Sequence, residues 1–272
     1  MYRLISVDLD GTLLNSQKKI SGENIEAIHM AIEKGIKVII CSGRVFKGAR
    51  VFARKINTKE PLVSCNGAVV KELETGKILY SNLLRKEDCY EVVDICRREN
   101  IYFHAYMDDD MYTENPDCPS ILYWKGNSEL PERDRVKINI TDDFKKTIEK
   151  SNILVSKIVV ISEDLNALSM IRKRIEEVTG VDVMSSNFDN FEVVNRGANK
   201  GTALKFLSEK LNIAREEIIA IGDNENDYTM LKYAGLSIAM GNAEDSIKRI
   251  ADLVTLTNDE SGVAKAIKKI VL

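Results

Sequence analysis

Some residue patterns are missing from this chain, and each absence argues against a class of chemistry. Only two histidines are present, His29 and His104, and neither belongs to the acidic motifs described below, so histidine-based catalysis is not favoured. The five cysteines are an odd number and show no Cys-x-x-Cys spacing. A disulfide framework or a zinc site is therefore not expected, and a reducing compartment is the simpler interpretation.

The chain also lacks a large excess of charge of one sign and a long apolar run. The formal net charge is −3 with both signs interspersed, which gives no indication of nucleic-acid binding. No apolar run is long enough to span a bilayer, and the N-terminus lacks the charged-then-apolar pattern of a signal peptide. We therefore expect a cytoplasmic protein without nucleic-acid or membrane partners. Its 272 residues, 44% of them hydrophobic, suffice for one large domain or two modest ones.

A strand followed by two carboxylates lies at the start of the chain. The apolar run Leu4–Val7 predicts a short buried strand, and Asp8, Asp10, Gly11 and Thr12 come after it. Because side chains alternate along a strand, the two aspartates leave it on the same side and repel each other. A hard divalent cation, which prefers oxygen ligands, would relieve this repulsion. The alternative is a surface turn with two solvated aspartates, since Asp-Gly is a common turn pair.

Strands and helices alternate in the first and last parts of the chain. After the first strand, the expected elements are a helix over 20–34, a strand over 36–41, a helix over 45–56 and a strand over 61–65. Further strands are expected over 218–221 and 236–240. This order predicts the α/β class, with a doubly wound, mostly parallel Rossmann-like sheet. In such sheets, ligands bind beyond the carboxyl ends of the strands.

The middle of the chain has fewer helices between its strands. A hairpin turn is expected over 74–77, and strands over 156–162 and 181–185 flank a helix over 164–179. This pattern predicts an inserted α+β domain with an antiparallel sheet. We place the insert at 84–187 and the core domain at 1–83 and 188–272. Phe191–Val194 is expected to resume the core domain as a strand.

Matching polar residues follow other predicted strands of the core sheet. They combine hydroxyl, amide, cationic and carboxylate groups, and they are Ser42, Gly43, Arg44, Asn66, Lys200, Asp223, Asn226 and Asp227. Magnesium is usually held by a few carboxylates, with water and phosphate oxygens completing its coordination. A lysine and a group that opens a helix can bind the remaining phosphoryl oxygens. The sequence therefore predicts a joint site for Mg²⁺ and a phosphate.

These residues fall into four ordered motifs that resemble a known superfamily. The motifs are Asp8-Leu-Asp10-Gly-Thr-Leu, Ser42-Gly-Arg, Asn199-Lys200-Gly201 and Gly222-Asp223-Asn-Glu-Asn226-Asp227. Together they resemble the haloacid dehalogenase-like hydrolases, and the long insertion and Asn66-Gly67 resemble the Cof-like branch with a large α/β cap. The resemblance implies a magnesium-dependent phosphatase that hydrolyses small phosphorylated metabolites, sugar phosphates or phosphorylated cofactors, through an aspartyl-phosphate intermediate.

The resemblance also implies a role for each catalytic residue. Asp8 resembles the nucleophile that attacks phosphorus. Asp10 resembles the general acid that protonates the leaving alkoxide and then the base that activates water. Ser42 resembles the hydroxyl that binds the transferring phosphoryl group, with Gly43 beside it. Lys200 resembles the cation that neutralises the nucleophile and the phosphate together.

A metal site is implied by the same motifs. Asp223 resembles a direct magnesium ligand, next to Asp8 and the backbone carbonyl of Asp10. Asn226 and Asp227 are expected to bind the metal through water or to support its direct ligands.

Two residues and the insert keep more than one interpretation. Arg44 is open between binding the substrate phosphate and tying its loop to a nearby carboxylate. Asn66 is open between a hydrogen bond near the phosphate and a simple turn. The insert is expected to act as a lid that selects the substrate, with candidates among the aromatic and acidic residues between Tyr102 and Trp124.

Other functions remain open on the same pattern. A phosphoryl transferase or mutase would differ only in the group that accepts the phosphoryl group. A non-catalytic regulator that binds a phosphometabolite would have no need of a general acid beside the nucleophile. A nucleotide-cofactor oxidoreductase would require Gly-x-Gly-x-x-Gly after the first strand, where this chain has Asp10-Gly11-Thr12.

Overall fold

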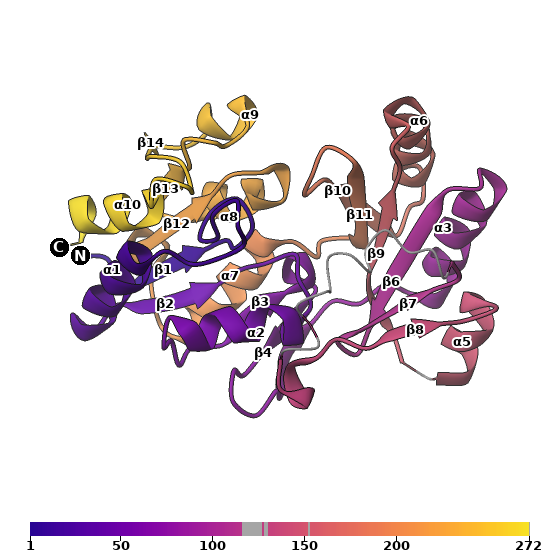
Figure 1. Cartoon of the computed structure of the whole chain (residues 1–272), viewed down its shortest axis with the longest axis horizontal. Helices are drawn as coiled ribbons and strands as arrows, with labels where there is room; N and C mark the ends of the chain where they lie inside the picture. Colours follow the sequence, from indigo (N-terminus) through magenta and orange to yellow (C-terminus); the bar gives the residue numbers. More distant parts are fainter. Residues whose placement is uncertain (116–126, 128–129, 152, 272) are drawn as a thin grey trace. The chain divides into compact units, whose positions relative to one another are not determined.

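The computed structural model describes residues 1–115, 127, 130–151 and 153–271. The chain forms two compact units, the first made of residues 1–81 and 199–272 and the second of residues 82–198 (Figure 1). Among the residues that the structure describes, no helix combines the length and the hydrophobicity that a membrane span requires.

The first unit is built on a five-stranded parallel sheet in the order β14-β13-β12-β1-β2. Its strands are β1 (Leu4–Val7), β2 (Lys37–Ile40), β12 (Ile218–Gly222), β13 (Leu236–Ala239) and β14 (Leu253–Val254). The N-terminal and C-terminal segments of the chain meet in the middle of this sheet, where Leu4 pairs with Ile218 and Val7 with Ile221. Every residue of β1 is buried, which explains why its apolar side chains do not alternate with polar ones.

Helices connect the strands of the first unit, as the alternating sequence pattern predicts. They are α1 (Gly22–Glu33), α2 (Phe46–Lys55), α7 (Lys200–Lys210), α8 (Tyr228–Tyr233), α9 (Asp245–Lys248) and α10 (Gly262–Ile270). Ser21 caps α1 by accepting a hydrogen bond from the N–H of Asn24. Side chains such as Ile28, Leu204 and Ile267 bury the inner faces of three of these helices in one core with the sheet.

The third predicted strand, over 61–65, belongs mainly to a separate small sheet. β3 (Leu62–Ser64) pairs antiparallel with β4 (Val69–Lys71), which pairs with β5 (Ile78–Ser81). A single parallel bridge between Cys41 and Val63 joins β3 to the end of β2. The difference arises because a short 3₁₀ turn, η1 (Cys65–Gly67), reverses the chain directly after β3 and makes it one arm of a hairpin.

The second unit is an α+β fold on a six-stranded sheet in the order β10-β11-β9-β6-β7-β8. Its strands are β6 (Tyr102–Met107), β7 (Asp110–Thr113), β8 (Ile138–Ile140), β9 (Val155–Ile161), β10 (Val181–Met184) and β11 (Asn190–Asn195). All neighbours are antiparallel except β7 and β8. The helices α3 (Lys86–Arg98), α5 (Phe144–Ser151) and α6 (Leu165–Glu176) share one apolar core with this sheet.

One predicted strand lies in the other unit. Residues Phe191–Val194 do form a strand, within β11, but β11 pairs with β9 and β10 instead of resuming the first unit. The boundaries expected at 83/84 and 187/188 therefore lie at 81/82 and 198/199. The physical reason is that Phe191 and Val193 are buried in the core of the second unit, a partner choice that a short apolar run does not reveal. Of the predicted lid residues, Tyr102 lies at the start of β6, and Trp124 lies outside the described residues.

Candidate active site

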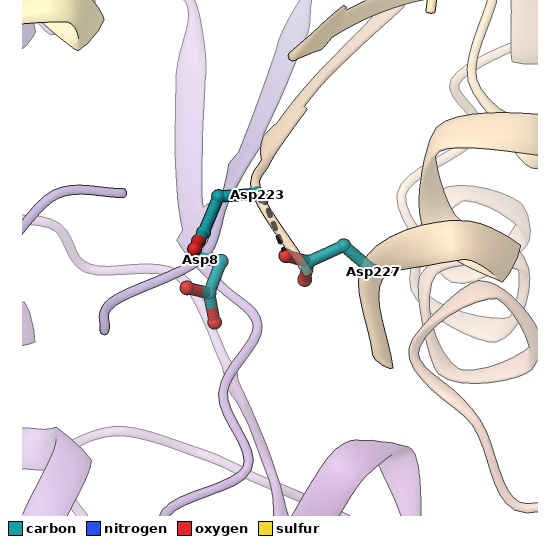
Figure 2. A group of neighbouring side chains, drawn as sticks. All are labelled: Asp8, Asp223 and Asp227. Atoms are coloured by element: carbon teal, nitrogen blue, oxygen red, sulfur yellow. Dashed lines mark hydrogen bonds between the residues drawn. The ribbon is translucent and has the colours of Figure 1, made fainter. Parts of the chain in front are cut away.

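Three carboxylates meet where two neighbouring strands of the first unit end. Asp8 follows β1, Asp223 follows β12, and Asp227 closes the 3₁₀ turn η5 (Glu225–Asp227). Because β1 and β12 are adjacent and parallel, their carboxyl ends lie at the same edge of the sheet. One oxygen of each carboxylate lies within 4.8 Å of the others, and all three residues are buried (Figure 2). The sequence-predicted residues Asp8, Asp223 and Asp227 are thus brought together.

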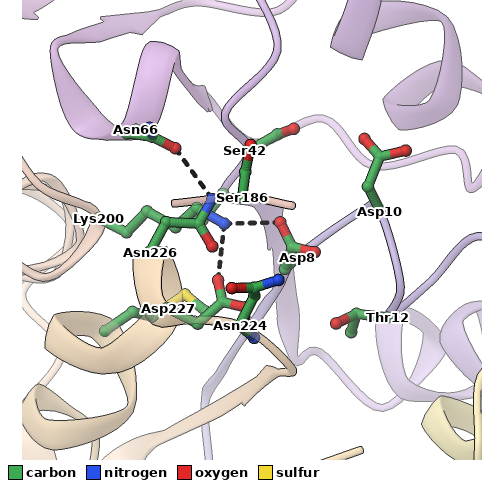
Figure 3. A network of polar contacts seen from close by, with 12 residues as sticks. Asp8, Asp10, Thr12, Ser42, Asn66, Ser186, Lys200, Asn224, Asn226 and Asp227 are labelled. Atoms are coloured by element: carbon green, nitrogen blue, oxygen red, sulfur yellow. Dashed lines mark hydrogen bonds and ion pairs between the residues drawn. The ribbon is translucent and has the colours of Figure 1, made fainter. Parts of the chain in front are cut away.

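Lys200 lies at the centre of this group. It is the first residue of α7, and Asn199 caps the helix by accepting a hydrogen bond from the N–H of Thr202. The Lys200 side chain is fully buried, and its Nζ donates to Oδ1 of Asp8 and to Oδ1 of Asp227, both at 2.6 Å (Figure 3). These two charge-assisted hydrogen bonds offset the cost of removing the ammonium group from water.

The second oxygen of Asp227 holds the backbone of its own loop. Oδ2 accepts the N–H of Asp223 at 2.9 Å and the N–H of Asn224 at 3.2 Å. Gly222 permits this approach, because a Cβ on that residue would lie 2.6 Å from the Asp227 carboxyl group. Asp227 therefore connects Lys200 to the loop that carries Asp223.

Asp223 is fixed from the other side by the motif that follows β1. The Thr12 hydroxyl donates to Oδ1 of Asp223 at 2.6 Å. Gly11 has a φ of +84°, and a Cβ there would lie only 2.3 Å from Oδ2 of Asp223. Glycine is thus required at this position both by the left-handed backbone and by the close carboxylate. The Asp-Gly-Thr sequence is fitted against Asp223 and is not a solvated surface turn.

The electrostatics of this group leave negative charge uncompensated. Burial raises the pKa of Asp8 to about 7; the Asp227 charge also raises it, whereas Lys200 lowers it. Burial, followed by the charges of Asp8 and Asp227, raises the pKa of Asp223 well above its usual range. Burial alone would lower the pKa of Lys200, but the two carboxylates that it contacts raise it overall. Full ionisation of the three carboxylates would exceed the charge of the one ammonium group by two negative charges, which one divalent cation would balance.

The donor set of this group fits magnesium. All three side chains offer carboxylate oxygens, the hard ligands that Mg²⁺ prefers, and their spacing allows more than one of them to bind the same ion.

The side chain of Asp10 lies apart from this group. Arg44 binds it through two hydrogen bonds, Nε to Oδ2 at 2.6 Å and Nη2 to Oδ1 at 2.8 Å, and Lys18 Nζ contacts Oδ1 at 2.9 Å. Figure 3 shows the Asp10 carboxyl group turned away from Lys200. Burial raises the pKa of Asp10, but the hydrogen bonds and charges of Arg44 and Lys18 outweigh it, so that the pKa is well below its usual range. Of the two interpretations of Arg44, this structure displays the tie to a carboxylate.

The remaining predicted residues lie around the Asp8–Lys200 contact. Ser42 follows the end of β2, is buried, and accepts the N–H of Arg44 on its hydroxyl oxygen at 3.1 Å across Gly43. The buried amides of Asn66 and Asn226 bind each other, with Nδ2 of Asn226 donating to Oδ1 of Asn66 at 3.2 Å. Figure 3 shows Ser42, Asn66 and Asn226 on the same side of Asp8 as Lys200.

Comparison with known proteins accounts for this arrangement. A family model described as haloacid dehalogenase-like hydrolase matches residues 5–267. The chain belongs to this family. Phosphatase YwpJ of Bacillus subtilis is 34% identical over 98% of this chain and 99% of its own length. The 5-amino-6-(5-phospho-D-ribitylamino)uracil phosphatase YcsE of the same organism is 35% identical over 99% of this chain and 96% of its own length.

A solved structure supports the same conclusion. The structure of a haloacid dehalogenase-like hydrolase from B. subtilis aligns with a TM-score of 0.88 and 34% identity over 99% of this chain and 100% of that one. The resemblance read from the four motifs and the α/β fold class with an inserted α+β unit are confirmed. The protein is a phosphatase of this family.

Two residues of this hydrolase's site were not assigned from the sequence. Thr12 was given no role from the sequence, yet its hydroxyl binds Asp223. Lys18 was not considered, because it follows the motif by several residues and is half exposed; a left-handed φ of +58° belongs to the turn that places it beside Asp10. Had β1 and β12 been predicted as neighbouring strands, Thr12 after β1 would have been expected close to Asp223 after β12.

Proposed function

We propose that this phosphatase is a cytoplasmic, magnesium-dependent enzyme that hydrolyses small phosphorylated metabolites through an aspartyl-phosphate on Asp8. The observation that carries the proposal is the buried contact between Asp8 and Lys200 inside a group of carboxylates with unbalanced negative charge. The name of the relative YcsE, a phosphatase of a phosphorylated ribityl compound, supports sugar phosphates or phosphorylated cofactors as the substrate class.

Asp8 and Asp223 are the side chains that would hold Mg²⁺ directly, together with the backbone carbonyl of Asp10. Both oxygens of Asp227 already accept hydrogen bonds, so Asp227 supports the site, and Asn226 would reach the ion through water. When bound, the ion supplies positive charge that reduces the repulsion between a carboxylate and a phosphate dianion.

The covalent chemistry is assigned to Asp8. One of its carboxylate oxygens attacks phosphorus, the bond from phosphorus to the substrate oxygen breaks, and the leaving alkoxide takes up a proton. Water then attacks the phosphorus of the aspartyl-phosphate, which releases inorganic phosphate and restores Asp8. The Lys200 ammonium group, which contacts Asp8 at 2.6 Å, favours the ionised form of the nucleophile and stabilises the charge on the phosphoryl oxygens. Ser42 donates its hydroxyl to the same phosphoryl group.

Asp10 is proposed as the group that donates the proton to the leaving alkoxide. In its present position it is paired with Arg44 and Lys18, which favour the ionised form. A protonated Asp10 is available only when its carboxyl group has separated from these cations, so the proposed catalytic position of Asp10 differs from the one described above. The second unit is proposed to act as the lid that selects the substrate.

The test is release of inorganic phosphate from para-nitrophenyl phosphate and from a panel of sugar phosphates and phosphorylated cofactors, with MgCl₂ and with a chelator. We expect release that requires Mg²⁺. We expect Asp8→Asn to lower turnover by about 10³-fold or more, whereas Asp142→Asn, at an exposed position, should leave it unchanged.

Each alternative has its own outcome in this assay. Substantial turnover by Asp8→Asn would remove Asp8 from the nucleophile role. Release that persists in chelator would contradict magnesium dependence. No release from any compound would favour a transferase that lacks its acceptor, or a binding protein.

A further inference from the structure

A left-handed turn follows β3, and it lies next to three loops of the active site. Its residues are Cys65, Asn66 and Gly67, with φ values of +50°, +57° and +92°. A positive φ is unfavourable for a residue that has a Cβ, and asparagine is among the few that tolerate it. Two such residues in a row before a glycine persist only where the surroundings hold them in place.

The backbone of the turn holds the loop that carries Ser42. The N–H of Cys65 donates to the carbonyl oxygen of Arg44 at 2.9 Å, and the N–H of Asn66 donates to the carbonyl oxygen of Ser42 at 3.1 Å. Consecutive amides of the turn thus bind the two ends of the Ser42–Arg44 loop. A change in the backbone of Asn66 would therefore move Ser42.

The side chain of Asn66 holds a second loop. Its Oδ1 accepts the Nδ2 proton of Asn226 at 3.2 Å; Asn66 is fully buried and Asn226 is 8% exposed (Figure 3). Asn226 lies in η5, immediately before Asp227, so this bond connects the turn to the carboxylate side of the site.

The start of α7 also packs against the turn. A Cβ added to Gly67 would lie 2.1 Å from the carbonyl oxygen of Asn199 and 2.9 Å from the backbone nitrogen of Lys200. The turn therefore lies in direct contact with the segment that positions Lys200, and little space is left for it to shift.

We propose that Asn66 is a positioning residue of this phosphatase, which sets the Ser42 loop through its backbone and Asn226 through its side chain. This inference rests on the proposed function, because it takes Ser42 as a phosphate ligand and Asn226 as part of the metal site. Asn66 acts through these two residues, so its backbone role and its side-chain role can be separated by substitution.

Two substitutions separate the roles. Asn66→Gly removes the amide but keeps a residue that adopts the left-handed conformation freely, whereas Asn66→Ala removes the amide and also disfavours that conformation. Asn57→Gly is the matched control, because Asn57 has a φ of +53° at an exposed helix end in α2's C-terminal turn. The affinities for Mg²⁺ alone, and for inorganic phosphate at saturating Mg²⁺, are measured by titration calorimetry and do not depend on turnover.

We expect Asn66→Gly to weaken Mg²⁺ binding by about tenfold, the usual effect of removing a group that orients a metal site, while phosphate binding changes by less than about twofold. Asn66→Ala should weaken both affinities, and Asn57→Gly neither. Asn66→Gly should have no further effect on Mg²⁺ binding in an Asn226→Ala background, because the two groups act as one pair.

Other results would overturn the proposal. Wild-type affinities in Asn66→Gly, or additive effects with Asn226→Ala, would show that Asn66 does not act through Asn226. A loss of thermal stability with unchanged affinities would make the turn purely structural. Wild-type protein that binds Mg²⁺ and phosphate but releases none from any substrate would contradict the proposed function alone; protein that binds neither would overturn both.

Discussion

The two units each bury a lysine against a carboxylate, and the two contacts are alike in distance and burial. Lys200 in the first unit lies 2.6 Å from Asp8 with a fully buried side chain. Lys157 in the second unit lies 2.6 Å from Glu192, and its side chain is 3% exposed. Burial and a short ion pair therefore do not distinguish the lysine that we propose to be catalytic from the lysine in the sheet of the second unit.

Charge balance does distinguish them. Lys157 and Glu192 contribute one charge of each sign, Glu192 also accepts the Ser186 hydroxyl at 3.2 Å, and the Lys157 ammonium lies 5.4 Å from the centre of the Tyr106 ring. The Lys157–Glu192 pair is thus neutral and further stabilised by its neighbours. Lys200 contacts two members of a group of three carboxylates, whose full ionisation would exceed the charge of Lys200 by two negative charges.

The two pairs also differ in their place on the elements. Lys157 and Glu192 lie within adjacent antiparallel strands, where Glu192 pairs with Val159, so the ion pair is a diagonal contact inside a sheet. Asp8 follows a strand and Lys200 begins a helix. Polar groups at the ends of elements are available to a ligand, whereas the two members of a cross-strand pair contact each other within the sheet.

The largest effect is expected from removing Lys200, the proposed catalytic cation. Lys200→Met should lower kcat/KM by about 10³-fold, because a preorganised charge at the phosphoryl group is lost. Its unfolding free energy in Mg²⁺ should fall by less than about 3 kcal/mol, since the ion and protonation compensate the carboxylates. Phosphate release and urea denaturation measure the two effects, with the exposed Lys205 of the same helix as the control in Lys205→Met. Comparable losses in both measurements would make Lys200 structural.

Substitution within the Lys157–Glu192 pair should lower the free energy of unfolding. Lys157→Met removes the cation that lies 2.6 Å from the buried Glu192 carboxylate, and we expect the free energy of unfolding to fall by about 3–5 kcal/mol in urea denaturation. Lys157→Met combined with Glu192→Met should restore most of this loss, because no buried charge remains. A double variant less stable than the single one would show that the pair is a net source of stability.

Binding of Mg²⁺ should have a smaller effect on stability, and a substitution in the first unit should remove that effect whereas one in the second unit should not. At a concentration about 100 times its dissociation constant, Mg²⁺ should add about 2.7 kcal/mol to the free energy of unfolding. Asp223→Asn should remove most of this gain, and Glu192→Gln should keep it, as measured by thermal denaturation with and without the ion. An equal gain in both variants would place the ion elsewhere.

The smallest effect is expected from pH in the second unit. Burial, with the charge of Lys157, lowers the pKa of His104 to about 3 from its ordinary 6.5. The unfolded chain therefore binds a proton that the folded chain does not, so stability falls as the pH decreases below 6.5, by about 2 kcal/mol from pH 6.5 to 5. The stability of wild type and His104→Gln should be compared over this range without Mg²⁺. Parallel curves would show that His104 is not the group responsible.

The sequence predicted the parts of the site that follow from strand order. Asp8 and Asp223 were expected to meet because parallel strands end at a common edge, and the structure brings them together with Lys200 and Asp227. This reasoning needed only element types and chain order, which apolar runs and motif spacing reveal.

Contacts that depend on side-chain direction were not predictable in this way. The ion pair of Asp10 with Lys18 depends on the left-handed φ of Lys18, a residue outside the motifs, whereas the bond of Arg44 to Asp10 is one of the two interpretations left open for Arg44. The placement of β11 in the second unit, and with it the Lys157–Glu192 pair, depends on which sheet accepts a short apolar strand. That choice is made by packing in three dimensions, not by local pattern.

The pairing of β1 with β12 has a consequence for protein synthesis. Leu4 pairs with Ile218, so β1 completes its hydrogen bonds only when β12, more than 200 residues later, has been made. Residues 82–198 leave the ribosome before that and form a unit of their own, while one edge of β1 stays open on the nascent chain. An open strand edge promotes aggregation, so this enzyme is expected to need protection by chaperones until β12 has left the ribosome. Asp8 emerges after β1 and Asp227 only after β12, so a prematurely terminated chain that lacks β12 has no complete active site.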